Sequence, residues 1–266
     1  MSAPGVHVEA LGDGDPVILV HGSFGTARAS FAAQLPLADG HRLLLVDRRG
    51  FGASPRAEDV GWATDADDVL ALLDETGPAH LVGHSYGAVV CLLAAGRRPE
   101  AVRSLVGIEP PLFAVAKDDP DADRVCQQSR AVADRADGLD GEAYIREWGA
   151  TVGMSRFEVA AWTESFSPAD WEAAESSRRE RWPGDAPVDF AALAASGFPR
   201  VLAHGGWNPE VVGRKAKVGA AFAAVCRAIA ERAGGEVERF AASTHNPQSE
   251  EPAAFNALLR RVWGAA

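Results

Sequence analysis

The segment that most constrains the fold is the pentapeptide Gly83-His84-Ser85-Tyr86-Gly87, which lies between an apolar run at residues 79–82 and a helix-like run at residues 88–95. A serine between two glycines at a strand-to-helix turn is held in a strained conformation, because glycine leaves room for a turn that other residues would obstruct. A pentapeptide can arise by chance in a chain with 27 glycines, so the flanking patterns matter. We expect this turn to expose the hydroxyl of Ser85 above a sheet as a nucleophile.

The rest of the chain alternates between strand-like and helix-like patterns. Short continuous apolar runs bounded by Gly, Pro or Asp are typical of strands buried on both faces of a parallel sheet, and they occur at residues 17–20, 43–46, 81–82, 105–108 and 201–203. Helical patterns lie at residues 65–76, 88–97, 218–233 and 252–263. The alternation predicts an α/β fold: a doubly wound, mostly parallel sheet flanked by helices, with its site at the carboxyl ends of the strands.

One long segment breaks this alternation. Residues 112–192 contain no convincing strand, but they contain helix-like segments and four tryptophans, Trp148, Trp162, Trp171 and Trp182. We therefore predict a core made of residues 1–111 and 193–266, with residues 112–192 inserted between two core strands as a helical cap. The four tryptophans could cover a small core of the cap itself, line a substrate channel, or do both.

The composition restricts the partners. The formal net charge is −11, whereas nucleic acids and anionic membranes reward a basic face. No apolar run reaches the length of a membrane span, and residues 1–14 lack the pattern of a secretory signal. The three cysteines, Cys91, Cys126 and Cys226, are isolated, which favours reduced packing residues and no metal site. We expect a cytoplasmic protein with a small-molecule substrate, no cofactor and no nucleic-acid or membrane partner; the oligomeric state stays open.

Further motifs identify a family. His21-Gly22-Ser23-Phe24-Gly25 follows the first strong strand, an Asp-Arg-Arg-Gly-Phe-Gly-Ala-Ser loop occupies residues 47–54, and Thr244-His245-Asn246-Pro247 precedes the last helix. Together with the serine pentapeptide, in this order, they resemble the α/β-hydrolase family over nearly the whole chain. The resemblance makes the serine turn a nucleophile elbow. It makes residues 47–54 a structural loop, to which we assign no chemistry.

The resemblance also implies roles for individual residues. A serine hydroxyl needs a base within hydrogen-bond reach, and His245 stands where the family has its catalytic histidine. The backbone N–H groups of Ser23 and Tyr86 would form the oxyanion hole that meets the charge of the tetrahedral intermediate. We expect the substrate pocket to be lined by Phe24, Trp148, Trp162, Trp171, Trp182 and Trp207.

The acid of the triad is where the sequence departs from the family. Most relatives place an aspartate in the turn after a late strand, and here residues 205–209 read Gly-Gly-Trp-Asn-Pro, so that Asn208 stands in its place. Glu109 directly follows the strand at residues 105–108, and some family members, among them certain haloalkane dehalogenases, place the acid there. We assign the triad acid to Glu109 and keep Asn208 as a possible orienting residue. A solvated strand-end turn is the alternative for Glu109.

These assignments lead to two hypotheses of different classes. The first is a serine hydrolase that cleaves a small, largely apolar ester or lactone through an acyl-enzyme on Ser85, with His245 as the general base. Acyl transfer and perhydrolysis remain open within it, whereas the aspartate-dependent routes of dehalogenases and epoxide hydrolases do not suit a serine. The second, motivated by Asn208, is a lyase that uses Ser85 and His245 as an acid–base pair, or a binding protein.

Other polar residues are expected to be structural. His21, His84 and His204 follow or end strands, and we expect them to fix loops by hydrogen bonds rather than to transfer protons. Residues 178–181, Arg-Arg-Glu-Arg, have the pattern of a solvated helix face in the insertion.

Overall fold

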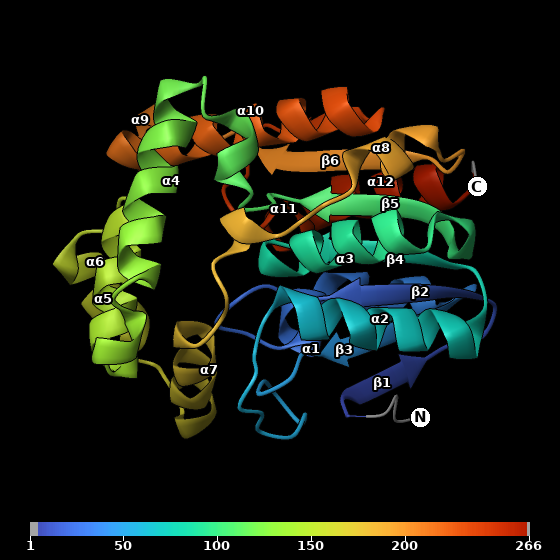
Figure 1. Cartoon of the computed structure of the whole chain (residues 1–266), viewed down its shortest axis with the longest axis horizontal. Helices are drawn as coiled ribbons and strands as arrows, with labels where there is room; N and C mark the ends of the chain where they lie inside the picture. Colours follow the sequence, from blue (N-terminus) through green and yellow to red (C-terminus); the bar gives the residue numbers. More distant parts are fainter. Residues whose placement is uncertain (1–4, 265–266) are drawn as a thin grey trace.

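The centre of the structure is a sheet of seven strands in the order β1-β3-β2-β4-β5-β6-β7, and a computed structural model describes residues 5–264 of the chain (Figure 1). β1 pairs antiparallel with β3, and every other neighbouring pair is parallel. The strands are β1 (His7–Leu11), β2 (Asp15–Val20), β3 (His41–Asp47), β4 (Ala79–His84), β5 (Val102–Ile108), β6 (Arg200–Gly205) and β7 (Glu236–Phe240).

The five strands predicted from apolar runs are β2 to β6. No such run occurs in β1 and β7, which lie at the two edges of the sheet. An edge strand is covered less than a central one, and four of the five residues of β7 are not buried. A continuous apolar run therefore marks the central strands alone.

Alternate side chains of the strands face two separate cores. In β2, Ile18 and Val20 belong to one hydrophobic cluster and Val17 and Leu19 to the other, as the twofold repeat of a strand requires. The first cluster is covered by α2 (Trp62–Thr76), α3 (Tyr86–Arg97), α8 (Phe190–Ala195) and α10 (Ala216–Ala233). The second is covered by α1 (Ala27–Ser30), η1 (Ala32–Ala38) and α12 (Pro252–Gly264). The predicted doubly wound sheet is confirmed.

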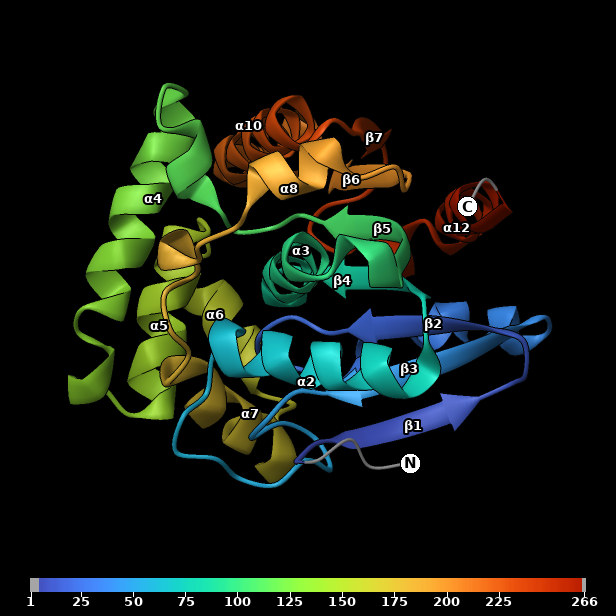
Figure 2. The same cartoon turned by 45° about the vertical axis from the view of Figure 1, so that its right-hand side comes forward.

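The segment between β5 and β6 is helical, and the part of it before α8 lies beyond the carboxyl ends of the parallel strands (Figures 1 and 2). Its elements before α8 are η3 (Phe113–Ala116), α4 (Pro120–Ala133), η4 (Ala136–Gly138), α5 (Gly141–Thr151), α6 (Arg156–Thr163), α7 (Pro168–Arg178) and η5 (Pro183–Asp185). The helices α4, α5, α6 and α7 each begin at a residue whose side chain accepts a backbone N–H of the first turn. These N-cap residues are Asp119, Asp140, Ser155 and Ser167. Such caps favour the start of a new helix at each point.

The segment has two kinds of packing. Residues of α5, α6 and α7, among them Ile145, Val159 and Ala174, form a small cluster of their own. In contrast, α4 packs on α10, and α8 packs on α3 and α10. The predicted boundary at residue 192 therefore falls inside α8, a helix that lies against the main core.

Two further findings concern the helices. None of those described within residues 5–264 is long and apolar enough to cross a membrane. Cys91, Cys126 and Cys226 are all buried and free, and each belongs to the hydrophobic cluster on one face of the sheet. Their expected packing role is confirmed.

Candidate active site

Ser85 occupies a tight turn between β4 and α3. Its backbone has φ 52° and ψ −119°, a conformation that costs an ordinary residue about 1–3 kcal/mol. The two glycines of the pentapeptide make the turn possible. A Cβ on Gly83 would lie 2.4 Å from the carbonyl oxygen of Gly87, and one on Gly87 would lie 2.2 Å from that of Val20. The strained turn read from the sequence is present.

Backbone strain is concentrated at the carboxyl ends of the parallel strands. Within residues 5–264, the residues other than glycine with positive φ are Phe24, Ser85, Glu109 and Trp207. Each follows the carboxyl end of a parallel strand, namely β2, β4, β5 and β6. Strain of this kind persists only where the surroundings enforce it, and it gathers at functional sites. The four turns mark the carboxyl ends of these strands as the candidate site.

Glu109 and His245 form a hydrogen-bonded pair in which the carboxylate is buried and the imidazole is partly exposed. Glu109 directly follows β5 and is completely buried. Its Oε2 accepts a hydrogen bond from Nδ1 of His245 at 2.7 Å, and its Oε1 accepts from the N–H of Gly205 at 2.9 Å and from the indole N–H of Trp207 at 2.7 Å. A buried carboxylate with three donors has its hydrogen-bonding demand met. Glu109 is therefore no solvated turn residue.

Asn208 does not take part in this arrangement, so its expected orienting role is wrong. Its side chain is exposed and caps the four-residue helix α9 (Pro209–Val212), with Oδ1 accepting the N–H of Glu210 at 3.0 Å. The late turn instead contributes Trp207, which packs against α10. A Cβ on Gly219 of α10 would lie 2.1 Å from Cγ of Trp207, so the indole reaches Glu109 because α10 has a glycine there.

The ring of His245 lies among three aromatic rings. The ring centroids of His84 and Phe222 are 4.8 Å and 5.0 Å away, and that of Trp207 is 6.5 Å away. The Nε2–H of His84 donates to the carbonyl oxygen of His245 at 3.0 Å. Burial, reinforced by the neighbouring His245, lowers the pKa of His84 to about 3. His84 is thus a neutral residue that fixes the histidine loop, as expected.

His204 and His21 also make structural contacts. His204 donates from Nδ1 to the carbonyl oxygen of Gly205 at 2.7 Å. His21 donates from Nδ1 to the carbonyl oxygen of Gly22 at 2.6 Å and accepts the backbone N–H of Arg48 at Nε2. Burial lowers the pKa of His21 well below its usual value. Both histidines therefore act as loop-fixing residues.

Ser85 and His245 open on a cavity of about 490 Å³ between the sheet edge and the helical segment. Most of its wall is apolar, and the aromatic residues of the wall are Phe24, Phe113, Tyr144, Trp148, Trp162, Trp182, Trp207 and Phe222, together with Tyr86. Trp171 is not part of the wall, contrary to expectation. The centroid of its ring lies 5.1 Å from that of Phe166, and both rings pack against the small cluster of the helical segment.

The two expected oxyanion-hole residues lie beside Ser85. Tyr86 is the first residue of α3, and the first N–H groups of a helix have no acceptor within the helix. Ser23 follows Gly22, where an added Cβ would lie 2.8 Å from Cβ of Ser85. Ser23 and Tyr86 both line the cavity.

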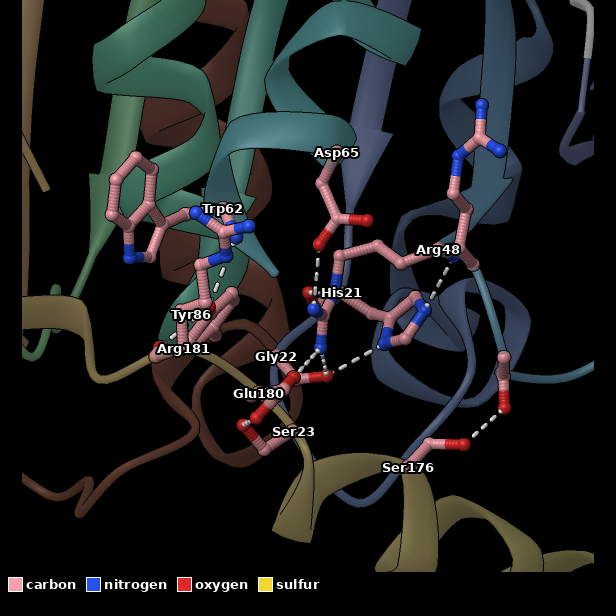
Figure 3. Close-up of polar contacts among 12 residues, drawn as sticks. His21, Gly22, Ser23, Arg48, Trp62, Asp65, Tyr86, Ser176, Glu180 and Arg181 are labelled. Atoms are coloured by element: carbon pink, nitrogen blue, oxygen red, sulfur yellow. Dashed lines mark hydrogen bonds and ion pairs between the residues drawn. The ribbon is translucent and has the colours of Figure 1, made fainter. Parts of the chain in front are cut away.

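A buried ionic cluster joins the helical segment to the core (Figure 3). The guanidinium of Arg48 donates to Asp65 at 2.9 Å and to Glu180 at 2.5 Å, and Ser23 Oγ donates to the second oxygen of Glu180 at 2.5 Å. The prediction that residues 178–181 form a solvated helix face is therefore wrong for Glu180. It lies just beyond α7, where the chain is no longer helical and turns inward.

Residues 5–264 contain no group of three or more His, Cys, Asp or Glu side chains arranged to hold a metal ion. The fold and the site together define a protein with a mostly parallel sheet, a strained serine at its centre, and a histidine beside that serine that is bonded to a buried carboxylate. The chain belongs to the α/β hydrolase family, whose family model matches residues 17–258.

Individual proteins resemble parts or all of the chain. A pimeloyl-[acyl-carrier protein] methyl ester esterase of Aeromonas hydrophila is 36% identical over 117 residues, which cover 43% of this chain and 45% of that protein. An sn-1-specific diacylglycerol lipase of Mus musculus is 36% identical over 105 residues, covering 36% of this chain and 34% of the lipase. The match thus spans less than half of either relative.

A solved structure gives a match over the whole fold. An α/β hydrolase from Sphaerobacter thermophilus superposes with a TM-score of 0.68 and covers 96% of both chains. The sequences are 22% identical, so this likeness bears on the fold alone.

Proposed function

We propose that the protein is a serine hydrolase that cleaves a small, largely apolar ester or lactone by acyl transfer to Ser85. The observation that carries the proposal is the 2.7 Å hydrogen bond between His245 and a fully buried Glu109. A histidine held in this way beside a strained serine is the arrangement that acyl transfer requires. The resemblance to an esterase and a lipase supports the same reaction class.

The proposed mechanism uses Glu109, His245 and the two backbone donors in turn. Glu109 accepts the Nδ1–H of His245, which leaves Nε2 free to take the proton of Ser85 as its oxygen attacks the carbonyl carbon. Glu109 also stabilises the imidazolium that forms. The backbone N–H groups of Ser23 and Tyr86 stabilise the oxyanion, and one such donor is worth about 2.7–4 kcal/mol. His245 then protonates the leaving alcohol, and water releases the acyl group by the same steps.

The cavity favours an uncharged substrate. Its cationic residues are Arg178, Arg181 and Lys215, and each is paired with a carboxylate, from Glu175, Asp59 and Glu158 respectively. A substrate carboxylate would have to compete with the carboxylate that is already paired with each cation. The aromatic wall and a volume of about 490 Å³ suit an apolar group of modest size. We propose that the part of residues 112–192 that precedes α8 acts as the cap that forms this wall.

The alternative of a lyase or a binding protein was motivated by the asparagine, Asn208, that stands where the family has its triad aspartate. Because Glu109 bonds to His245, the proposed triad has a carboxylate, and we retain the hydrolase.

The test is covalent labelling. We expect a fluorophosphonate to add to the wild-type protein at Ser85, and Ser85→Ala to abolish labelling while the thermal unfolding transition is kept. Hydrolysis of p-nitrophenyl esters should be lost in the same variant. An unmodified wild-type protein after long incubation with several unhindered phosphonates would contradict the proposal.

A further inference from the structure

We propose that Glu180 is a positioning residue for the oxyanion hole: through Ser23 it holds the turn that carries one oxyanion donor, and it does so only when the cap rests on the core. The inference depends on the proposed function of Ser85. It concerns a residue 157 positions away from Ser23 in the chain, contributed by the cap and buried beneath it.

The hydrogen bonds of Glu180 use both of its carboxylate oxygens. Oε2 accepts the hydroxyl of Ser23 and Oε1 accepts Nη2 of Arg48, each at 2.5 Å. The side chain of Glu180 is 5% exposed. The neighbouring backbone is held by the cap as well, because the N–H of Phe24 donates to Oγ of Ser177 at 2.9 Å. Two cap residues therefore hold two consecutive residues of the turn.

Arg48 fixes the same turn from the side of the core. Its Nε donates to the carbonyl oxygen of His21 and its Nη2 to that of Gly22, both at 3.0 Å (Figure 3). The Gly22 carbonyl and the Ser23 N–H belong to one peptide bond, which is planar and trans. When the carbonyl points at Arg48, the N–H must point the opposite way. The orientation of the proposed donor is thus set by Arg48 and His21, which bond to the Gly22 carbonyl, and by Glu180, which bonds to the side chain of Ser23.

The charges of the cluster explain why a carboxylate is tolerated near an oxyanion. Burial alone raises the pKa of Glu180, and Arg48 opposes this effect. Burial would lower the pKa of Arg48, but Glu180 and Asp65 raise it above its usual value. The guanidinium is 1% exposed, so its charge is little screened by solvent and offsets part of the negative charge of Glu180 and Asp65. Without the carboxylate of Glu180, the turn keeps its contacts with Arg48, His21 and Ser177 but loses the charged acceptor of the Ser23 hydroxyl.

The consequence is a link between the cap and the chemical step. An oxyanion donor interacts with the transition state more strongly than with the bound ester, so its misplacement lowers kcat rather than raising KM. Displacements near 1 Å can cost about a hundredfold in rate. A loss of the Glu180 contact should therefore appear in kcat and in the affinity for transition-state analogues.

The experiment compares four proteins with the wild type: Glu180→Gln, Ser23→Ala, their double variant, and Glu172→Gln as the control. Glu172 also joins the cap to the core, through an exposed ion pair with Arg56 at 2.6 Å, but it does not touch the oxyanion turn. For each protein we would measure kcat and KM for p-nitrophenyl butyrate, the inhibition constant of an alkylboronic acid, and the thermal unfolding transition.

We expect Glu180→Gln and Ser23→Ala each to lower kcat by about 10- to 100-fold, with KM within about threefold of wild type and a matching loss of boronate affinity. The double variant should be little worse than either single one, because both remove one link. Glu172→Gln should behave as wild type.

Several results would overturn the inference. These are wild-type kcat and boronate affinity in Glu180→Gln, an effect on KM alone, or losses that multiply in the double variant. If Glu180→Gln fails to fold, Ser23→Ala decides, since it removes the hydroxyl and leaves the ion pair between Arg48 and Glu180 in place. A wild-type protein that neither hydrolyses esters nor binds the boronate would overturn the proposed function itself.

Discussion

Replacing Glu109 with glutamine should lower kcat/KM by about four orders of magnitude, as the corresponding exchange does in a serine protease. The loss corresponds to about 5 kcal/mol of transition-state stabilisation. The size of the effect follows from the three donors around the carboxylate, which come from His245, Gly205 and Trp207.

A glutamine at this position has two orientations. In one, the amide oxygen faces His245 and the NH₂ group faces two buried N–H donors, each then costing about 1–3 kcal/mol as an unsatisfied group. In the other, the oxygen keeps the donors of Gly205 and Trp207, and the NH₂ group donates to Nδ1 of His245. The second orientation is favoured. It places the ring proton on Nε2, where the base must be free to accept the proton of Ser85.

The assay is the hydrolysis of p-nitrophenyl butyrate, with circular dichroism to confirm folding. Asn208→Ala is the matched control at the other turn: it should cost about 1 kcal/mol of stability through the lost helix cap and leave kcat/KM within about threefold. Asn208→Asp should fail to rescue Glu109→Gln, because Asn208 is exposed. A Glu109→Gln enzyme within tenfold of wild type, or a rescue by Asn208→Asp, would refute the reasoning.

Three further predictions concern the pocket and its surroundings. Trp148→Ala should shift the preferred acyl length in a series of p-nitrophenyl esters, because its ring lines the cavity, whereas Trp171→Ala should not; equal profiles would make both packing residues. Gly219→Ala should lower kcat by at least tenfold, since the new methyl group would lie 2.1 Å from Trp207; unchanged kinetics would show that the indole contact is dispensable. The pKa of His84 is lowered from 6.5 to about 3, so below pH 6.5 the unfolded chain binds a proton that the folded chain does not. The free energy of unfolding should therefore be unaffected by this group above pH 6.5 and should fall as the pH falls from 6.5 to 3, and denaturant titrations at pH 7 and 4.5 should show a pH slope that is smaller in His84→Gln by about 1.4 kcal/mol per pH unit. Equal slopes in the two proteins would contradict this prediction.

The sequence predicted the centre of the molecule better than its edges. The serine turn could be predicted because glycines on both sides of Ser85 permit only a few backbone conformations, and the central strands because they are apolar throughout. β1 and β7 carry no comparable pattern. The order of the motifs along the chain indicates the family from the sequence alone, and for this reason Ser85 and His245 could be predicted together.

The contacts between distant residues could not be predicted in the same way. Glu109 and Asn208 both follow strands, and the choice between them depends on the turn at Trp207, whose positive φ sends the indole toward the site. Glu180 stands in a run of charges that suits a solvated helix, yet it bonds to Arg48, 132 residues away. No local pattern reports such a pairing.

The central claim is that an ester acylates Ser85. The most direct measurement is rapid-quench mass spectrometry of the intact protein and its peptides during the first turnover of p-nitrophenyl butyrate. We predict a burst of p-nitrophenol near one equivalent, accompanied by the mass of one butyryl group on the peptide that contains Ser85, and no adduct in Ser85→Ala. Turnover without any adduct, or an adduct on another residue, would contradict the account.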